Sequence, residues 1–412
     1  MFSVDSGATL LIGDLLDAAD GVLDGSANCP VVTITNDVPD PTALAAVFAD
    51  PNCFSFQEIF PGGFTPRFGG DVEDAALTVG LRGETAGGIL WDASAAYGKN
   101  DVDFFINNTV NASLGPATPV NFDPGKEVQE EFNLNFDVSY AFGDGGNIAG
   151  GVEYRDEKFE IGLGQTESWS IGSLADQGFS AASNGFPGFS PIAAGNWSRS
   201  NVAAYADLEI SPAEDWTVGL AARFEDFEDF GTTMNSKFAT NFRINDSVAF
   251  RSSVSSGFRA PTPGQSNAFN VSTEFDLVLM DLVNNGNSPS ISPVAALRCV
   301  LPLTAEKSIN FTLGTILTLG DIDVTIDYFN IKLKDRLGQS QLFALTQAEI
   351  DALIMAGVTS AGNLANFRFF VNDFETRTQG IDLIANYSAS LLGETDFTLA
   401  FNWTENKVTK FN

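Results

Sequence analysis

The sequence predicts an all-β protein, an antiparallel transmembrane β-barrel, and three observations lead to this prediction. Apolar and polar residues alternate over stretches of about ten residues, as in a strand with one apolar and one polar face. Short turns and long irregular connections follow one another along the chain. No run of about 18 consecutive apolar residues occurs, so a transmembrane helix is not expected. A spanning strand leaves no such run.

Composition narrows the possible functions. The chain has 412 residues, with 53 acidic against 21 basic side chains and a formal net charge of −32, so no nucleic-acid partner is expected. Histidine is absent, which removes most familiar hydrolase chemistry, histidine zinc sites and imidazole ligands for haem. A hydrophobic content of 44% is too high for a disordered acidic polypeptide. We therefore expect a folded protein that is not an enzyme and holds no metal or cofactor.

The clearest alternation runs from Phe132 to Phe142, where every even position is apolar and Asn133, Asn135 and Asp137 are polar. The pattern recurs from Trp216 to Glu225 and from Phe397 to Thr404. In a barrel the apolar face meets lipid and the polar face meets the lumen. We expect Phe132, Leu134, Phe136, Val138 and Tyr140 to face lipid.

Connection lengths give the strand count. Six short turns are expected at 83–88, 143–147, 211–215, 245–246, 319–321 and 392–395, which implies six hairpins and about twelve strands. The intervening connections are 99–127, 162–196, 226–234, 259–306 and 338–376, most of them far longer than ordinary loops. Short turns on one rim and long loops on the other are typical of outer-membrane barrels. We expect the long connections to face outward and the short turns to face the periplasm.

Soluble β-sandwiches and propellers also alternate. The strand lengths, the unequal connections, and aromatic residues near strand ends such as Phe142, Trp197 and Trp216 favour the membrane barrel over them. Two helices are expected inside connections. Asp40 and Pro41 form an N-cap and first-turn pair. Thr346 and Glu349 have capping-box spacing, with Gly357 as a stop.

Several residue groups could form sites. Cys29 and Cys53 share a turn-rich segment and would form a disulfide in an oxidising compartment, whereas Cys299 is expected to be an unpaired loop thiol. Phenylalanines 54, 56, 60, 64 and 68 would either stack on a ligand or form a small core in a loop over the barrel mouth, and we favour the small core. Two groups of acidic residues are not expected to form a metal or catalytic site. The first group misses the spacing of an EF-hand calcium loop and is expected to form a solvated acidic face: Asp14, Asp17, Asp20 and Asp24. The second group lies together at one strand end: Glu225, Asp226, Glu228 and Asp229.

Several short sequence motifs resemble the barrel region of TonB-dependent receptors of the Gram-negative outer membrane. The strongest is GFRAPTPGQ, with family-motif residues Gly257, Phe258, Arg259, Ala260, Pro261 and Thr262. Further matches, in order, are EKSINFTLG (306–314), DYFNIKLKDRL (327–337) and ETRTQGIDL (375–383). The stretch 100–125 is similar to a subset of these receptors.

The resemblance implies an outer-membrane protein that binds and imports a scarce solute of the siderophore, cobalamin, glycan or peptide class, with energy from the inner membrane. Its partners would be outer-membrane lipid, the small solute and, through a plug domain, the TonB system. Family barrels have about 22 strands. We therefore expect a fragment that lacks the plug and the C-terminal strands, with residues 1–71 as an extracellular loop region containing a short helix and 72–412 as a partial barrel.

No ligand-binding residue can be assigned from the resemblance. The motif places Arg259 where a strand leaves the membrane, and we expect it to hold the following connection through loop carbonyls or a carboxylate rather than to contact solute. The alternative function is a passive porin or an adhesive barrel without a plug.

Overall fold

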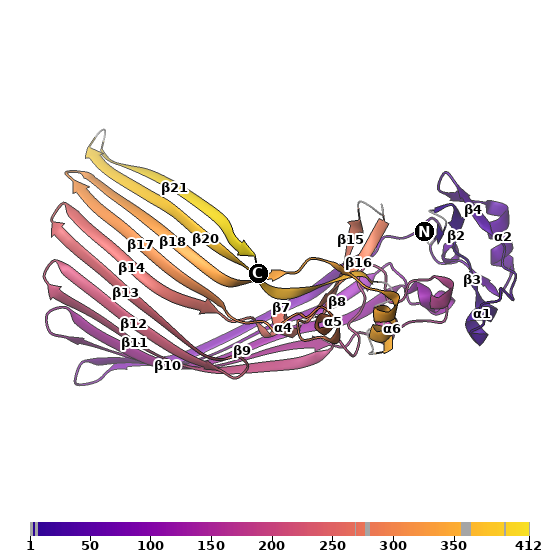
Figure 1. Ribbon diagram of the computed structural model, residues 1–412, viewed down its shortest axis with the longest axis horizontal. Coiled ribbons are helices and arrows are strands. Elements are labelled where there is room, and N and C mark those ends of the chain that lie inside the picture. The colour runs from indigo at the N-terminus through magenta and orange to yellow at the C-terminus, as the bar shows by residue number, and fades with distance from the viewer. Residues whose placement is uncertain are drawn as a thin grey trace.

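Twelve long strands form one curved wall in the computed structural model, which describes residues 3–4, 7–267, 269–276, 281–355, 364–390 and 393–411 (Figure 1). Each strand pairs antiparallel with the next long strand along the chain. The strands are β7 (Arg67–Glu84), β8 (Ile89–Asn107), β9 (Asn121–Phe142), β10 (Gly146–Gly162), β11 (Gly195–Ala213), β12 (Trp216–Phe227), β13 (Gly231–Asn245), β14 (Val248–Arg259), β17 (Glu306–Leu319), β18 (Ile322–Gln339), β20 (Leu364–Ser390) and β21 (Glu394–Phe411). The predicted all-β fold of about twelve antiparallel strands is confirmed.

The connections carry the remaining elements. None of the described helices is both long and apolar enough to cross a membrane. The helices are α1 (Leu15–Asp20), α2 (Pro41–Ala49), α3 (Thr166–Trp169), α4 (Pro263–Asn267), α5 (Pro293–Leu297) and α6 (Gln347–Met355). The short strands are β1 (Ser3–Val4), β2 (Thr9–Leu10), β3 (Gly13–Asp14), β4 (Val32–Thr35), β5 (Val38–Pro39), β6 (Cys53–Phe54), β15 (Asn270–Asp276), β16 (Asp281–Ser288) and β19 (Phe343–Ala344).

The two expected helices form around their predicted caps. The Asp40 carboxylate accepts hydrogen bonds from the backbone N–H groups of Thr42 and Ala43, at 2.9 and 2.8 Å, and so begins α2. At α6, the Thr346 N–H donates to Glu349 Oε2 at 2.7 Å and the Glu349 N–H donates to Thr346 Oγ1 at 3.4 Å, as in a capping box. The expected stop at Gly357 lies outside the described residues.

The six short turns lie together at one end of the wall, and the long connections and the N-terminal segment lie at the other (Figure 1). Glycines with positive φ allow the tightest reversals. Gly143 and Gly145, with φ of 56° and 110°, close the turn between β9 and β10.

One expected connection is wrong. Residues 226–227 and 231–234 belong to β12 and β13, so only 228–230 link these strands. The chain reverses there because Gly231 adopts φ 84°, a conformation that costs glycine little. Strands also extend into other expected connections, since β8 runs to Asn107, β9 begins at Asn121 and β20 begins at Leu364. The first long strand, β7, begins at Arg67.

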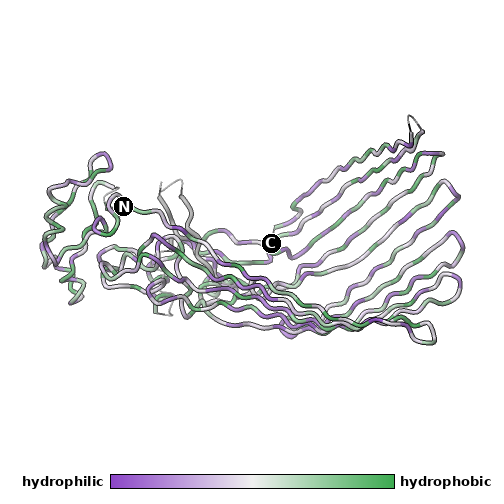
Figure 2. Tube along the Cα trace, turned by 180° about the vertical axis from the view of Figure 1, so that it is seen from behind, coloured by the Kyte–Doolittle hydropathy of each residue, from purple (hydrophilic) through white to green (hydrophobic). Residues whose placement is uncertain are grey.

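The wall is a single layer, and its two faces differ along every strand. Hydropathy alternates along the traces in Figure 2. On β9 the side chains of Phe132, Leu134, Phe136, Val138 and Tyr140 are between 36% and 46% exposed, whereas the polar residues between them are less exposed. The concave face of a curved sheet is the more crowded one, so the polar residues face inward and the apolar residues face outward.

Close packing is found mainly in the layer of connections. One cluster contains Phe54, Phe56, Val110, Leu174 and Phe179. Others centre on Ile106 with Phe186, on Phe367 with Phe369, and on Val32 with Val47. The connections therefore form an ordered layer over one end of the wall.

Candidate functional site

The inward face carries a chain of alternating charges across β9, β10, β11 and β12. Arg155 donates to Asn133 Oδ1 at 3.1 Å and to Glu153 Oε1 at 3.0 Å. Arg223 donates to Glu153 Oε2 at 3.2 Å and to Glu225 Oε1 at 2.6 Å. Every second residue of neighbouring strands meets on one face, and the register aligns these groups.

These pairings limit how the arginines can bind a solute. Both guanidinium groups already contact two carboxylates or amides of the wall, and Asn201 donates to Glu225 at 3.1 Å. Further along the wall, Arg251 donates to Asp327 Oδ1 at 2.8 Å. An anionic solute would have to displace carboxylates that are held in place, whereas a neutral or cationic solute would not.

The most enclosed arginine is Arg199 on β11, whose side chain is 5% exposed. Its Nε donates to Glu157 Oε2 at 2.9 Å and its Nη1 donates to the Pro261 carbonyl at 2.6 Å. The guanidinium carbon lies 5.4 and 5.7 Å from the ring centroids of Phe227 and Phe230. Arg199 therefore holds the GFRAPT segment, which is 62 residues away in sequence.

The GFRAPT segment ends β14 and starts the following connection. Gly257 lies close to β17, and a Cβ added there would come within 2.9 Å of Ser308 Oγ, so that the serine hydroxyl would have to turn away. Thr262 and Gln265 exchange hydrogen bonds, Thr262 N–H to Oε1 at 3.0 Å and Gln265 N–H to Oγ1 at 3.1 Å. This exchange begins α4 in the manner of a capping box.

Arg259 is placed differently from Arg199. Its side chain is 60% exposed, and its Nη1 lies 3.8 Å from Glu306 Oε2. Arg259 and Glu306 are register partners on β14 and β17, so this ion pair joins the two ends of the 259–306 connection. Glu306 is nearly buried and also accepts the Leu337 N–H at 2.7 Å. Of the two partners expected for Arg259, a carboxylate or loop carbonyls, the structure shows the carboxylate of Glu306. The contact with a loop carbonyl is made by Arg199, which sequence reasoning missed because cross-strand register decides it.

The phenylalanine-rich segment packs within the connections. Phe54 and Phe56 are 3% and 6% exposed, and their ring centroids lie 4.8 Å apart, so the small-core interpretation is confirmed for these two. Phe68 is 48% exposed and stacks on Phe186 at 4.2 Å.

Cys29 and Cys53 form a disulfide with Cα atoms 5.6 Å apart, and Cys299 is free and exposed. The bridge crosslinks the segment that precedes β7.

The two acidic groups have structural partners. Asp14 and Asp17 are nearly buried, which corrects the expected solvated face. Asp14 caps α1 through the Leu16 and Asp17 N–H groups, and Asp17 accepts from the Gly25 and Ser26 N–H groups. Their short carboxylates satisfy turn and helix-start donors, a role that charge counting does not reveal.

In the second group, Glu225 pairs with Arg223, Glu228 accepts from Ser200 and Asp229 lies 3.6 Å from Arg199. Across the described part of the chain, no group of three or more His, Cys, Asp or Glu side chains could hold a metal ion.

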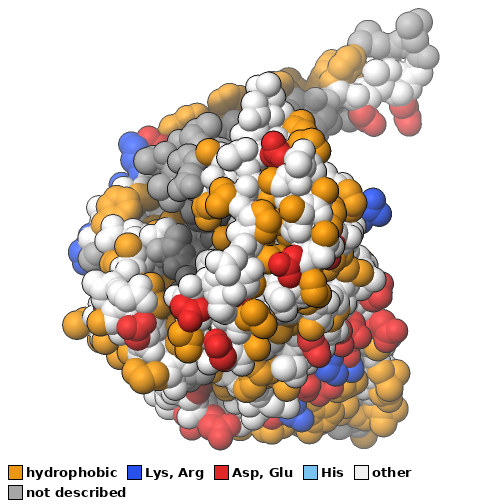
Figure 3. All heavy atoms as spheres, turned by 90° about the vertical axis from the view of Figure 1, so that its right-hand side faces the viewer, with side chains coloured by type: hydrophobic (Ala, Val, Ile, Leu, Met, Phe, Trp, Pro, Cys, Tyr) orange, Lys and Arg blue, Asp and Glu red, His pale blue; other side chains and the backbone are white. Residues whose placement is uncertain are grey.

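The end with the long connections is mixed in charge. Figure 3 looks onto this end and shows acidic side chains scattered over it, with fewer basic ones. Within the connections, Arg298 donates from both terminal nitrogens to Glu349, one bond being 3.1 Å. This contact, together with the capping bonds from Thr346, lowers the pKa of the Glu349 carboxyl to about 2.

The decisive comparison is with a family model described as "TonB dependent receptor-like, beta-barrel", which matches residues 35–412. The chain belongs to the TonB-dependent receptor β-barrel family. This family lies in the outer membrane, and the wall, the short turns and the long connections have its architecture.

Solved structures share the fold at low sequence identity. A mutant of the ferric enterobactin receptor from Pseudomonas aeruginosa has a TM-score of 0.53 at 13% identity, over 80% of this chain and 43% of that one. The siderophore receptor PirA from the same organism gives 0.51 at 12% identity, over 82% and 57%. PirA from Acinetobacter baumannii gives 0.51 at 13%, over 80% and 44%. This TonB-dependent receptor barrel thus spans less than two thirds of each receptor's length, and no curated protein sequence matches it significantly.

Proposed function

We propose that this chain forms wall and outer connections of an outer-membrane receptor that binds a scarce solute and imports it with energy from the inner membrane. The match of the barrel-family model to 35–412 carries this proposal. Residues 1–71 would form an extracellular loop region and 72–412 a partial barrel. The TonB system would act through a plug domain enclosed by this wall, and lipid would cover the apolar face. No nucleic-acid partner and no catalytic role are proposed.

The ion pairs of the inward face favour a solute that is neutral or cationic, from the siderophore, cobalamin, glycan or peptide class. Arg155, Arg199 and Arg223 are all neutralised by wall carboxylates. An anionic solute that bound to these three arginines would have to displace the wall carboxylates.

Uptake by the complete receptor tests the proposal. Candidate solutes of each class are supplied to cells that carry the receptor, with TonB intact or deleted. We expect accumulation of one solute only when TonB is present. Equal flux in both strains, increasing linearly with outside concentration, would instead show a passive porin.

A further inference from the structure

The part of the chain before Arg67, which we call the N-terminal unit, contains a small sheet that is covered on one face only. Its strands follow the order β1, β2, β4, β5. The register partners Leu10 and Val32 are buried and pack with Val47 of the helix α2. Side chains at alternate positions of a strand point to opposite faces of the sheet. The face that points away from α2 is therefore bare.

The bare face is made of β-branched side chains that carry no charge. Its residues are Val4, Thr9, Val31, Thr33, Thr35 and Val38. Thr33 is the register partner of Thr9, and Val38 is the register partner of Thr35. Val31 and Val38 are 73% and 62% exposed. A sheet face that meets water normally carries polar and charged residues, so this face has the composition of a surface that is covered.

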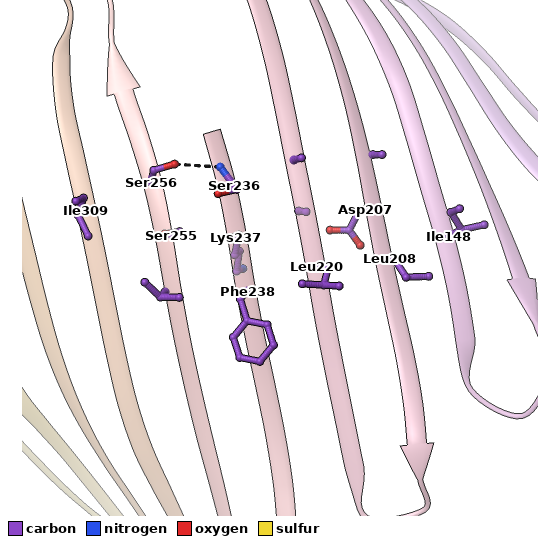
Figure 4. Close-up of a pocket in the computed structure, with 14 residues that line it drawn as sticks. Ile148, Asp207, Leu208, Leu220, Ser236, Lys237, Phe238, Ser255, Ser256 and Ile309 are labelled. Atoms are coloured by element: carbon purple, nitrogen blue, oxygen red, sulfur yellow. Dashed lines mark hydrogen bonds between the residues drawn. The ribbon is translucent and has the colours of Figure 1, made fainter. Parts of the chain in front are cut away.

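Membrane lipid does not account for the bare face. On the wall, Leu208, Leu220 and Phe238 are register partners on neighbouring strands, and they lie side by side in Figure 4, where lipid would cover them. The N-terminal unit lies at the opposite end of the molecule from the six short turns, with other connections between it and the wall (Figure 1). In the orientation of the proposed function, on which this inference rests, the bare face is outside the cell.

The charge of the N-terminal unit restricts what can cover the bare face. The unit contains nine acidic side chains and no lysine or arginine. Asp37, in the turn between β4 and β5, is exposed and follows Thr35 by two residues. Among the described residues of the unit, no carboxylate has a lysine or arginine within 4.0 Å. This negative charge is unbalanced, so a surface that docks here needs positive charge to be complementary.

We propose that the bare face of the N-terminal unit docks a basic polypeptide, whose apolar side chains cover Val31 and Val38 and whose lysines or arginines face the surrounding carboxylates. A second layer of secondary structure is what normally covers a sheet face, so a polypeptide fits this face better than a small cation does. A second copy of the chain would bring the same negative charge to the contact, and like charges oppose association. Lipid phosphates would be repelled in the same way.

Titration of the complete receptor in phosphatidylcholine nanodiscs tests the inference, with a short synthetic peptide of alternating lysine and valine as the probe. The double variant Val31→Ser, Val38→Ser should bind this peptide about tenfold more weakly than the parent receptor, because apolar contact is lost. Thr35→Lys, which places a positive charge on the face, should also weaken binding. The matched control is Leu301→Ser, at a residue that is 78% exposed in another connection, and its affinity should stay within about twofold of the parent.

A second peptide, of alternating lysine and serine, has the same charge and should bind the parent receptor more weakly. Equal binding of both peptides, or unchanged affinity in the double variant, would overturn the proposal. No binding by the parent would assign the face to another part of the receptor, and self-association that the double variant abolishes would assign it to a second copy; both results also overturn the proposal. TonB-dependent uptake should be retained in all variants, and its absence from the parent would contradict the import function and not the docking site.

Discussion

At the scale of single residues, neighbouring positions on a strand lie in different solvents. Phe136 and Asn135 are adjacent on β9, and their register partners on β10 are Val152 and Glu153. Arginine at Phe136 should reduce the free energy of unfolding by roughly 2–4 kcal/mol, because its charge would enter the hydrocarbon, and arginine at Asn135 should cost much less. Urea unfolding of the complete barrel in lipid vesicles measures both. Equal losses would show that the faces are assigned wrongly.

Arg199 gives the second residue-scale prediction. Arg199→Ala would leave the Glu157 carboxylate and the Pro261 carbonyl without their donor, and breaking a buried ion pair costs about 3 kcal/mol. We expect faster protease cleavage within 259–306 as well. The control is Arg243→Ala, since Arg243 forms an exposed pair with Asp215 and should cost less than about 1 kcal/mol. A connection that stays resistant in Arg199→Ala would contradict this role.

Residue patterns in the sequence predicted the helix caps, but they did not predict which side chains on different strands contact each other. Asp40, Thr346 and Glu349 could be read from the sequence because a cap and its helix are only a few residues apart. Arg199 and Pro261 could not, because their contact depends on the register of the four strands from β11 to β14. For the same reason, the paired arginines of the inward face were not foreseen.

At the scale of elements, α5 and α6 are joined by the contact between Arg298 and Glu349. The folded pKa of Glu349 is about 2, below its ordinary value of 4.5, so the contact contributes its full stability above pH 4.5 and loses it as the pH falls through about 2. We expect an acid protease to cleave 293–355 slowly at pH 4, and faster in Glu349→Gln at the same pH. Equal cleavage of both proteins at pH 4 would show that the contact does not hold these helices.

Most long strands and turns could be predicted because alternation and turn residues are local signals. The short link at 228–230 could not, since its acidic residues are typical of a longer loop. The parallel pairing of β16 with β20 was also beyond sequence reasoning, because it joins segments of two different connections.

At the scale of the whole molecule, the two ends of the wall differ. Six short turns lie at one end and an ordered layer of connections lies at the other (Figure 1). The sequence predicted this asymmetry from connection lengths, and the family match agrees with it. The solute site could not be predicted, because inward-facing residues acquire their partners only when the strands pair.

The orientation of the barrel, with the long connections outside and the short turns in the periplasm, is tested most directly by labelling intact cells. Epitope tags are inserted in the complete receptor at Gly178, an exposed residue in the connection between β10 and β11, and at Gly145 in the short turn between β9 and β10. Antibody should reach the tag at Gly178 on intact cells and the tag at Gly145 only after the outer membrane is opened. Labelling of Gly145 on intact cells, with none at Gly178, would show that the barrel is inserted the other way and would contradict the account.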